Sequence, residues 1–231
     1  MMQEAVVWGP LIIKYNWIAI IFSVMAAHVT MKHWLKGKSD LIKPILNDIT
    51  NVLFGAFLIW KFSVIIFNPV TVLNNPYYLL YFTGGERGIL LSAIVVLVFL
   101  FFQSRKRRIT FWVYAAVLAA SLFSYIIFYS IFQLIFNNPT TSLFLYDLSQ
   151  IVLAIVLLVW MYSRKESFEK PQEINQLILW FSIGQIFSYF FKSFSVVVFL
   201  GLSSEQLVFL TVALCCLFIH IFIKKESFNE S

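Results

Sequence analysis

The feature that most constrains this chain is a series of apolar runs, each roughly 20 residues long, separated by short polar segments. A helix of that length spans the bilayer hydrocarbon core, which is about 30 Å thick. Hydrophobic residues make up 61% of the 231 residues and charged residues only 12%, about half the charged fraction of a soluble domain. The sequence therefore predicts a single integral membrane domain over residues 1–231.

The apolar runs predict an all-α bundle of about seven transmembrane helices. The predicted spans are residues 11–31, 44–68, 88–103, 110–136, 142–163, 174–200 and 205–223. The third span is short, and we expect it to extend outward through Gly84 and Gly85.

The basic residues predict the orientation of this bundle. Thirteen of the 17 Lys and Arg residues follow the first, third, fifth and seventh spans. Loops enriched in this way face the cytoplasm, so the N-terminus is expected outside and the C-terminus in the cytoplasm. Topology also accounts for the net charge of +6, and nucleic acid is not expected as a partner.

A second group of ionisable residues lies in the outer parts of the predicted spans, where a charge costs several kcal/mol unless it is paired, hydrated or able to snorkel. These residues are Lys14, Lys61, Glu86, Arg87, Asp147 and Lys192. If they converge, they form a positively biased, outward-facing pocket suited to an anionic lipid headgroup. The alternative is that each lysine snorkels separately to the surface. We favour snorkelling for Lys14, and both interpretations stay open for Lys61 and Lys192.

The remaining polar residues predict no metal site or cofactor. Asp48, near the cytoplasmic end of the second span, is expected to form a local pair with Lys43 or Arg108. The three histidines lack metal-ligand spacing, and the adjacent Cys215 and Cys216 are interpreted as packing residues. The sequence also lacks the GxSxG, HExxH and Walker A patterns.

Several local patterns also follow one another in a recognisable order. They lie at residues 13–17, 53–58, 84–88, 109–112, 145–147, 184–192 and 201–207. In order and spacing they resemble prolipoprotein diacylglyceryl transferase, a seven-span bacterial enzyme that moves a diacylglyceryl group from phosphatidylglycerol to a lipoprotein precursor. The resemblance implies a bacterial cytoplasmic membrane location. It also implies an anionic phospholipid such as phosphatidylglycerol, and a lipoprotein or another membrane protein, as partners.

The chain departs from this family at the positions that carry its chemistry. The family's histidine after the Gly-Gly pair has no match, and the nearest residue is Arg87. Gln185 replaces an arginine, Tyr189 replaces a glutamate, and only Lys192 keeps a basic counterpart. Thioether formation needs an activated thiol and cations that stabilise the leaving phosphate. The resemblance therefore implies a divergent member in which the parent catalysis is lost or heavily reworked.

These observations predict a non-catalytic relative that binds phospholipid, a lipoprotein or another membrane partner at an outward-facing pocket. The candidate pocket residues are Lys14, Lys61, Gly84, Gly85, Glu86, Arg87, Tyr146, Asp147 and Lys192. One alternative is an active diacylglyceryl or acyl transferase with a relocated site at Glu86, Arg87, Tyr146 and Asp147. A small-solute transporter ranks below both, because the sequence has no inverted repeat.

Overall fold

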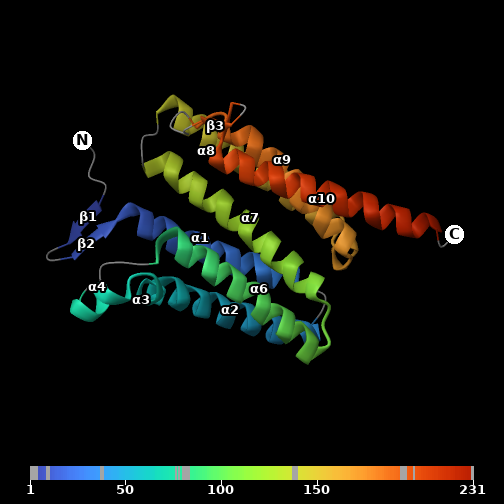
Figure 1. The fold of residues 1–231 in the computed structure, drawn as a ribbon, viewed down its shortest axis with the longest axis horizontal. Helices are drawn as coiled ribbons and strands as arrows, with labels where there is room; N and C mark the ends of the chain where they lie inside the picture. Colours follow the sequence, from blue (N-terminus) through green and yellow to red (C-terminus); the bar gives the residue numbers. More distant parts are fainter. Residues whose placement is uncertain are drawn as a thin grey trace. The chain divides into compact units, whose positions relative to one another are not determined.

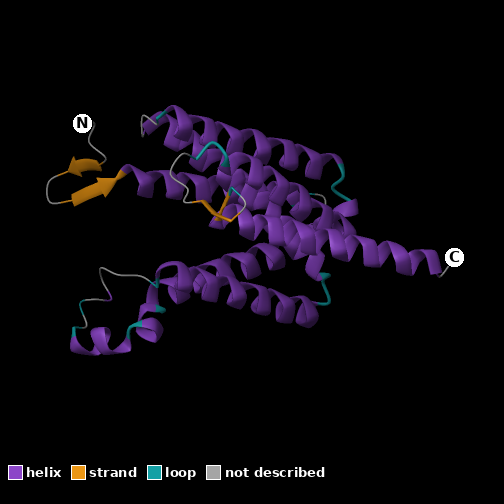
Figure 2. Ribbon diagram, turned by 45° about the horizontal axis from the view of Figure 1, so that its top comes forward, coloured by secondary structure: helices purple, strands orange, loops and turns teal. Residues whose placement is uncertain are grey.

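The computed structural model describes residues 5–8, 11–36, 39–75, 77, 79, 84–136, 140–192, 197–199 and 201–229. Two compact units divide the chain, one formed by Met1–Trp34 with Ala115–Ser231 and the other by Leu35–Tyr114. Helices dominate both units, and short strands are the minor component (Figures 1 and 2). The predicted all-α class is confirmed.

The Leu35–Tyr114 unit, called here the second unit, is built on two long helices that pack side by side (Figure 1). Its helices are α2 (Ser39–Phe62), α3 (Val64–Phe67), α4 (Pro69–Asn74) and α6 (Gly85–Arg107), followed by the start of α7 (Phe111–Phe136). The α2–α6 packing buries Ile45, Ile49 and Leu100, each at most 1% exposed. Apolar side chains from both helices thus form the core of this unit.

The other unit, called here the first unit, contains two helical groups. Its elements are β1 (Ala5–Trp8), β2 (Leu11–Lys14), α1 (Tyr15–Trp34), the rest of α7, α8 (Thr141–Ser163), η1 (Ser167–Glu169), α9 (Pro171–Tyr189), β3 (Val197–Phe199), β4 (Leu202–Ser203) and α10 (Ser204–Asn229). The α9 helix packs against both α8 and α10. The α1 helix contacts α7, where the Thr30 hydroxyl donates to Ser124 Oγ at 2.8 Å and Phe22 stacks on Phe132.

Five helical stretches among the described residues are long and apolar enough to cross a membrane. They are Lys43–Phe67, Gly85–Arg107, Phe111–Phe136, Thr141–Ser163 and Ser204–Ile221. These stretches match the predicted second, third, fourth, fifth and seventh spans. The third begins at Gly85, close to the expected outward extension. By its helices the chain is therefore a multi-pass membrane protein.

The first and sixth predicted spans are only partly helical. Residues 11–14 form β2, which pairs antiparallel with β1, so the helix α1 begins at Tyr15 rather than at residue 11. The paired segments are rich in Val and Ile and flank the Gly9-Pro10 dipeptide in sequence, a pattern that favours a hairpin.

The sixth span was predicted as a helix over residues 174–200, and this prediction is wrong at its end. The α9 helix stops at Tyr189, and Val197–Phe199 pairs antiparallel with Leu202–Ser203. Gly201 lies between these strands at φ +79°, a left-handed conformation that glycine adopts without steric penalty. The β-branched Val197 and Val198 together with this glycine favour a hairpin over a continued helix.

Candidate functional site

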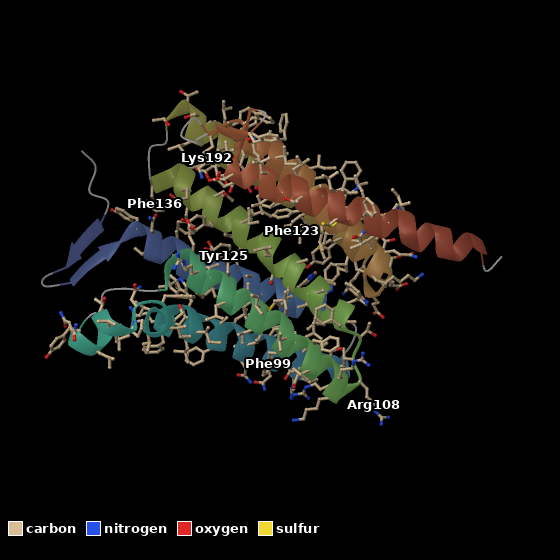
Figure 3. All side chains as sticks on the ribbon, in the orientation of Figure 1. Phe99, Arg108, Phe123, Tyr125, Phe136 and Lys192 are labelled. Atoms are coloured by element: carbon tan, nitrogen blue, oxygen red, sulfur yellow. The ribbon has the colours of Figure 1, made fainter. Side chains whose placement is uncertain are left out.

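Lys192 lies just after α9, with its ammonium group placed over two tyrosine rings. Its Nζ is 5.2 Å from the ring centroid of Tyr189 and 5.7 Å from that of Tyr146. The two rings meet edge to face at 5.6 Å, and all three residues are half-buried. A cation over an aromatic face is attracted by the ring quadrupole. We call these three residues the tyrosine–lysine cluster, and Figure 3 labels its lysine.

Local backbone geometry brings Lys192 back over the helix that precedes it. Tyr146 lies in the second turn of α8, and Tyr189 is the last residue of α9. Beyond Tyr189 the chain makes a tight turn, in which the Lys192 N–H donates to the Tyr189 carbonyl at 3.1 Å. The preceding Phe191 N–H donates to Ser188 in the same way, at 3.1 Å. The helix end therefore places the lysine directly above the tyrosine.

A capping box at the start of α10 fixes the neighbouring end of α9. The Ser203 N–H donates to Gln206 Oε1 at 2.9 Å, and the Gln206 N–H donates to Ser203 Oγ at 3.3 Å. These reciprocal bonds satisfy donors at the helix N-terminus. The Gln206 Nε2 also donates to the Ile186 carbonyl at 3.0 Å. One buried side chain thus connects the first turn of α10 to the last turn of α9.

The nine predicted pocket residues divide between the two units. Lys14, Tyr146, Asp147 and Lys192 belong to the first unit, and Lys61, Gly84, Gly85, Glu86 and Arg87 belong to the second. The first unit brings Tyr146 and Lys192 together, while Asp147 is half-buried at the next position of α8. Lys14 ends β2, and its side chain lies outside the described part of the chain. A pocket that combines both groups stays a prediction.

In the second unit the glycine pair serves packing and chain geometry. The Gly84 N–H donates to the Trp60 carbonyl at 3.0 Å, and a Cβ added at Gly84 would collide with the Ser63 hydroxyl. Gly85 has a positive φ of 57° at the start of α6.

Two other predicted residues of this unit, Glu86 and Arg87, follow on the first turn of α6 and are exposed. Lys61 lies half-buried in the last turn of α2.

Asp48 is the centre of a cluster that the sequence only partly predicted. Its carboxylate is 3% exposed and accepts hydrogen bonds from α6 and α7. Gln103 Nε2 and Arg107 Nη2 donate to Oδ1 at 2.8 Å and 2.9 Å. The Tyr114 hydroxyl donates to Oδ2 at 2.8 Å, and Arg107 Nε lies 2.6 Å from the same oxygen. We call these four residues the Asp48 cluster; the arginine holds the carboxylate in a two-point contact.

The expected partner of Asp48 was Lys43 or Arg108, and this prediction is wrong. Lys43 precedes Asp48 by five positions on α2, a spacing that does not place two side chains on one helix face. Arg108 is the C-cap of α6 in the left-handed conformation, with φ 56°. The α6 helix therefore ends at Arg107. Arg107, and not Arg108, contacts the Asp48 carboxylate.

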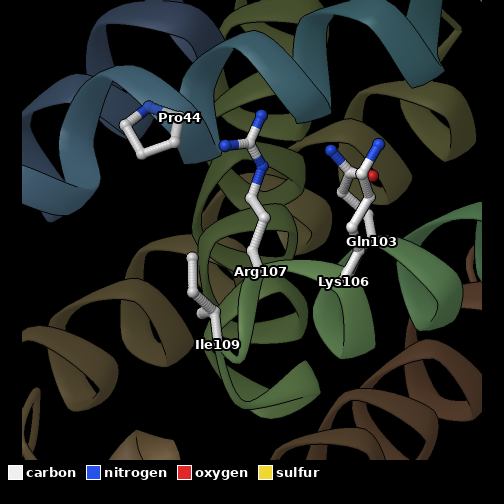
Figure 4. Close-up of a pocket in the computed structure, with 5 residues that line it drawn as sticks. All are labelled: Pro44, Gln103, Lys106, Arg107 and Ile109. Atoms are coloured by element: carbon white, nitrogen blue, oxygen red, sulfur yellow. The ribbon is translucent and has the colours of Figure 1, made fainter.

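An open pocket of about 570 Å³ adjoins this cluster (Figure 4). Its lining residues are Pro44, Gln103, Lys106, Arg107 and Ile109. In the close-up the Arg107 side chain extends toward the α2 helix that carries Pro44. Because Gln103 and Arg107 both donate to Asp48, much of the polar lining of this pocket is already engaged within the protein.

A buried amide pair in the first unit occupies a position that the resemblance singles out. In the resemblance described above, Gln185 corresponds to an arginine of the transferase family. In the structure its Nε2 donates to Gln150 Oε1 at 2.8 Å. Gln150 Nε2 donates back to Gln185 Oε1 at 2.9 Å. The two amides thus join α8 to α9 and are 6% and 4% exposed. A neutral amide engaged in this way supplies no positive charge for a leaving phosphate.

The fold and these clusters define a helical, multi-pass membrane protein with buried polar contacts between its helices. Within the described residues, no group of three or more His, Cys, Asp or Glu side chains is arranged to hold a metal ion. No protein-family model matches the sequence, and no curated protein matches it.

Proposed function

We propose that this protein binds the headgroup of an anionic phospholipid at the tyrosine–lysine cluster and does not transfer the lipid. The observation that carries the proposal is the half-buried Lys192 ammonium, placed 5.2 Å and 5.7 Å from two tyrosine ring centroids. A lipid phosphate beside this ammonium would accept a charge-assisted hydrogen bond. The Tyr146 and Tyr189 hydroxyls are hydrogen-bonded to each other, so one of them would be left to donate to the lipid, and the rings offer an apolar surface to the glycerol backbone.

The proposal includes seven spans in a bacterial cytoplasmic membrane, with the N-terminus outside. The α1 and α9 helices, of 20 and 19 residues, are each about 30 Å long and would add two spans to the five long apolar stretches. Basic residues lie in the last turns of α1 and α6 and at the C-cap of α8, as expected for cytoplasmic ends. The tyrosine–lysine cluster, at the start of α8 and the end of α9, would then face outward.

This topology is tested by reporter fusions. Green fluorescent protein fused at the C-terminus should fluoresce, because it would fold in the cytoplasm. Alkaline phosphatase fused after Phe136 should be active, because that position would lie outside. An inactive phosphatase at this position, with the fusion protein present in the membrane, would contradict the proposed orientation.

The loss of catalysis is supported by the residues at the family's reactive positions. Gln185 is engaged with Gln150, and Tyr189 lies under Lys192 where the family has a glutamate. The proposed role is therefore that of a divergent relative that holds phospholipid, alone or with a lipoprotein or another membrane protein. Expression in a strain depleted of the authentic transferase should not restore growth. Growth at verified expression would overturn the non-catalytic part of the proposal.

Binding is tested by native mass spectrometry of the full-length protein in detergent with phosphatidylglycerol. We expect Lys192→Ala to reduce phosphatidylglycerol occupancy at one site about tenfold, while Lys192→Arg keeps it, since arginine preserves the charge. Lys170→Ala is the matched control, because this exposed lysine precedes the same helix. Lys61→Ala tests separately whether the second unit contributes. Occupancy in Lys192→Ala equal to that of the wild type would refute the site.

A further inference from the structure

A second pocket in the second unit lies where α6 ends and α7 begins. It has a volume of about 530 Å³, within the range of about 300–1,000 Å³ typical of ligand sites. Its lining residues are Phe101, Ser104, Arg105, Arg108, Ile109, Thr110, Phe111 and Trp112. Both helices are long and apolar enough to cross a membrane, so the turn between them lies at a membrane boundary whichever way the chain is oriented.

The arginines of the adjoining basic run, Arg105 to Arg108, have different partners. Arg107 is bound to Asp48 at 2.6 Å and does not line this pocket. Arg105 and Arg108 do line it, and none of the eight lining residues is acidic. Among the described residues that line it, the pocket therefore combines two cationic groups with no acidic residue, which favours an anionic ligand.

The backbone holds these two arginines in a defined turn. Arg108 is the C-cap of α6 and has φ 56°, the left-handed conformation in which many helices end. The Ile109 N–H donates to the Ser104 carbonyl at 3.1 Å, and the Ser104 hydroxyl donates to the Ile109 carbonyl at 2.6 Å. Figure 3 labels Arg108 at this end of α6. The turn is thus fixed by bonds on both sides of Arg108.

Aromatic rings form the apolar part of the pocket. The Arg105 guanidinium lies 5.2 Å from the ring centroid of Phe101. Phe101 contacts Phe111 edge to face at 6.4 Å, and Phe111 contacts Trp112 at 5.7 Å. Of these rings, Trp112 is of the type that gathers at the level of lipid headgroups. The pocket therefore pairs cations with an apolar wall, the combination that a charged headgroup with attached acyl chains requires.

We propose that this pocket binds the phosphate of an anionic phospholipid at the membrane boundary. The two arginines would hold the phosphate, since a guanidinium donates two parallel hydrogen bonds to it. The aromatic wall would contact the glycerol and the first carbons of the acyl chains. This site uses residues of the second unit only, so it is independent of the tyrosine–lysine cluster.

The test uses the full-length protein carrying Lys192→Ala, so that the tyrosine–lysine cluster does not contribute. Binding of phosphatidylglycerol is measured by native mass spectrometry with Arg105→Gln/Arg108→Gly. Glycine suits the positive φ at position 108, so this variant removes both charges while keeping the turn. We expect affinity to fall about tenfold or more. Lys106→Gln, in the same basic run but lining the other pocket, should change affinity less than twofold.

Three outcomes would overturn the proposal. The first is unchanged phosphatidylglycerol binding in the double variant. The second is an equal loss in Lys106→Gln, which would indicate a general effect of surface charge. The third is displacement of the lipid by millimolar inorganic phosphate, which would show that a free anion occupies the pocket. If the double variant does not fold, Arg105→Gln alone, at an exposed position, provides the same test with a smaller expected loss.

Discussion

The Asp48 cluster and the tyrosine–lysine cluster both place a charged side chain at the end of a helix pair, but they differ in exposure. Asp48 is 3% exposed and is enclosed by donors from Gln103, Arg107 and Tyr114. Lys192 is half-buried over the rings of two tyrosines, so part of its side chain lies at the surface of the protein. The enclosed charge is suited to stability, and the accessible charge is suited to binding.

The largest effect on stability is expected from Asp48→Ala. This change leaves the fully buried Tyr114 hydroxyl without its acceptor and removes the group that joins α2 to α6 and α7. We expect a loss of about 3 kcal/mol, at the upper end for a buried group deprived of its hydrogen-bond partner. In detergent, the Tm followed by tryptophan fluorescence should fall by roughly 10 °C.

The control for this variant is Glu86→Ala, which removes an exposed acid of the same unit and should shift the Tm by less than about 2 °C. A Tm for Asp48→Ala close to that of Glu86→Ala would show that the buried Asp48 contributes no more to stability than an exposed acid, and would contradict its assigned role.

A smaller effect is expected at the neutral amide pair of the first unit. Gln150→Leu leaves the buried Gln185 amide without its partner and should destabilise the protein by about 1 kcal/mol. The double variant Gln150→Leu/Gln185→Leu should recover part of that loss, because neither amide is then left unsatisfied. A double-mutant cycle built on thermal unfolding measures the coupling. Strictly additive losses would indicate that the two amides act independently.

The capping box should contribute a similar or slightly smaller amount. Ser203→Ala removes the oxygen that accepts the Gln206 N–H and should destabilise α10 by about 0.5–1 kcal/mol. Ser204→Ala, at the next and exposed position, is the matched control. Hydrogen exchange of the first turn of α10 should increase in the Ser203 variant alone. Equal exchange in both variants would argue against a capping role.

The smallest expected effect concerns the rings under Lys192. Tyr146→Phe keeps an aromatic face and should retain most of the phosphatidylglycerol affinity. Tyr146→Leu removes that face and should weaken binding about threefold, in line with a partly exposed cation–π contact. Native mass spectrometry compares the two directly. An equal loss in Tyr146→Phe and Tyr146→Leu would assign the contribution to the hydroxyl, which both variants lack, instead of the ring.

The long apolar runs allowed most of the helices to be predicted, because composition and length alone identify such segments. The same criterion failed at residues 11–14 and 197–199. There the apolar β-branched residues form hairpins, and hydropathy does not distinguish a strand from the end of a span.

The polar contacts were harder to predict, because they depend on local turns. Arg107, which binds Asp48, and Arg108 are adjacent in sequence, and the left-handed φ of Arg108 distinguishes their backbones in the structure. Likewise, the contact of Lys192 with Tyr189 depends on the tight turn at the end of α9. The Gln150–Gln185 pair joins residues 35 positions apart, and a single sequence carries no signal for such a partner.

The central claim is that Lys192 forms the lipid site while Asp48 supports the fold, and a thermal shift tests both roles together. The measurement uses full-length protein carrying Arg105→Gln/Arg108→Gly, with and without phosphatidylglycerol in large excess over its dissociation constant. The lipid should raise the Tm by about 5 °C. Adding Asp48→Ala should lower the Tm but leave the lipid-induced rise, whereas adding Lys192→Ala should abolish the rise at a nearly unchanged starting Tm. A full lipid-induced rise in the Lys192→Ala protein would contradict the account.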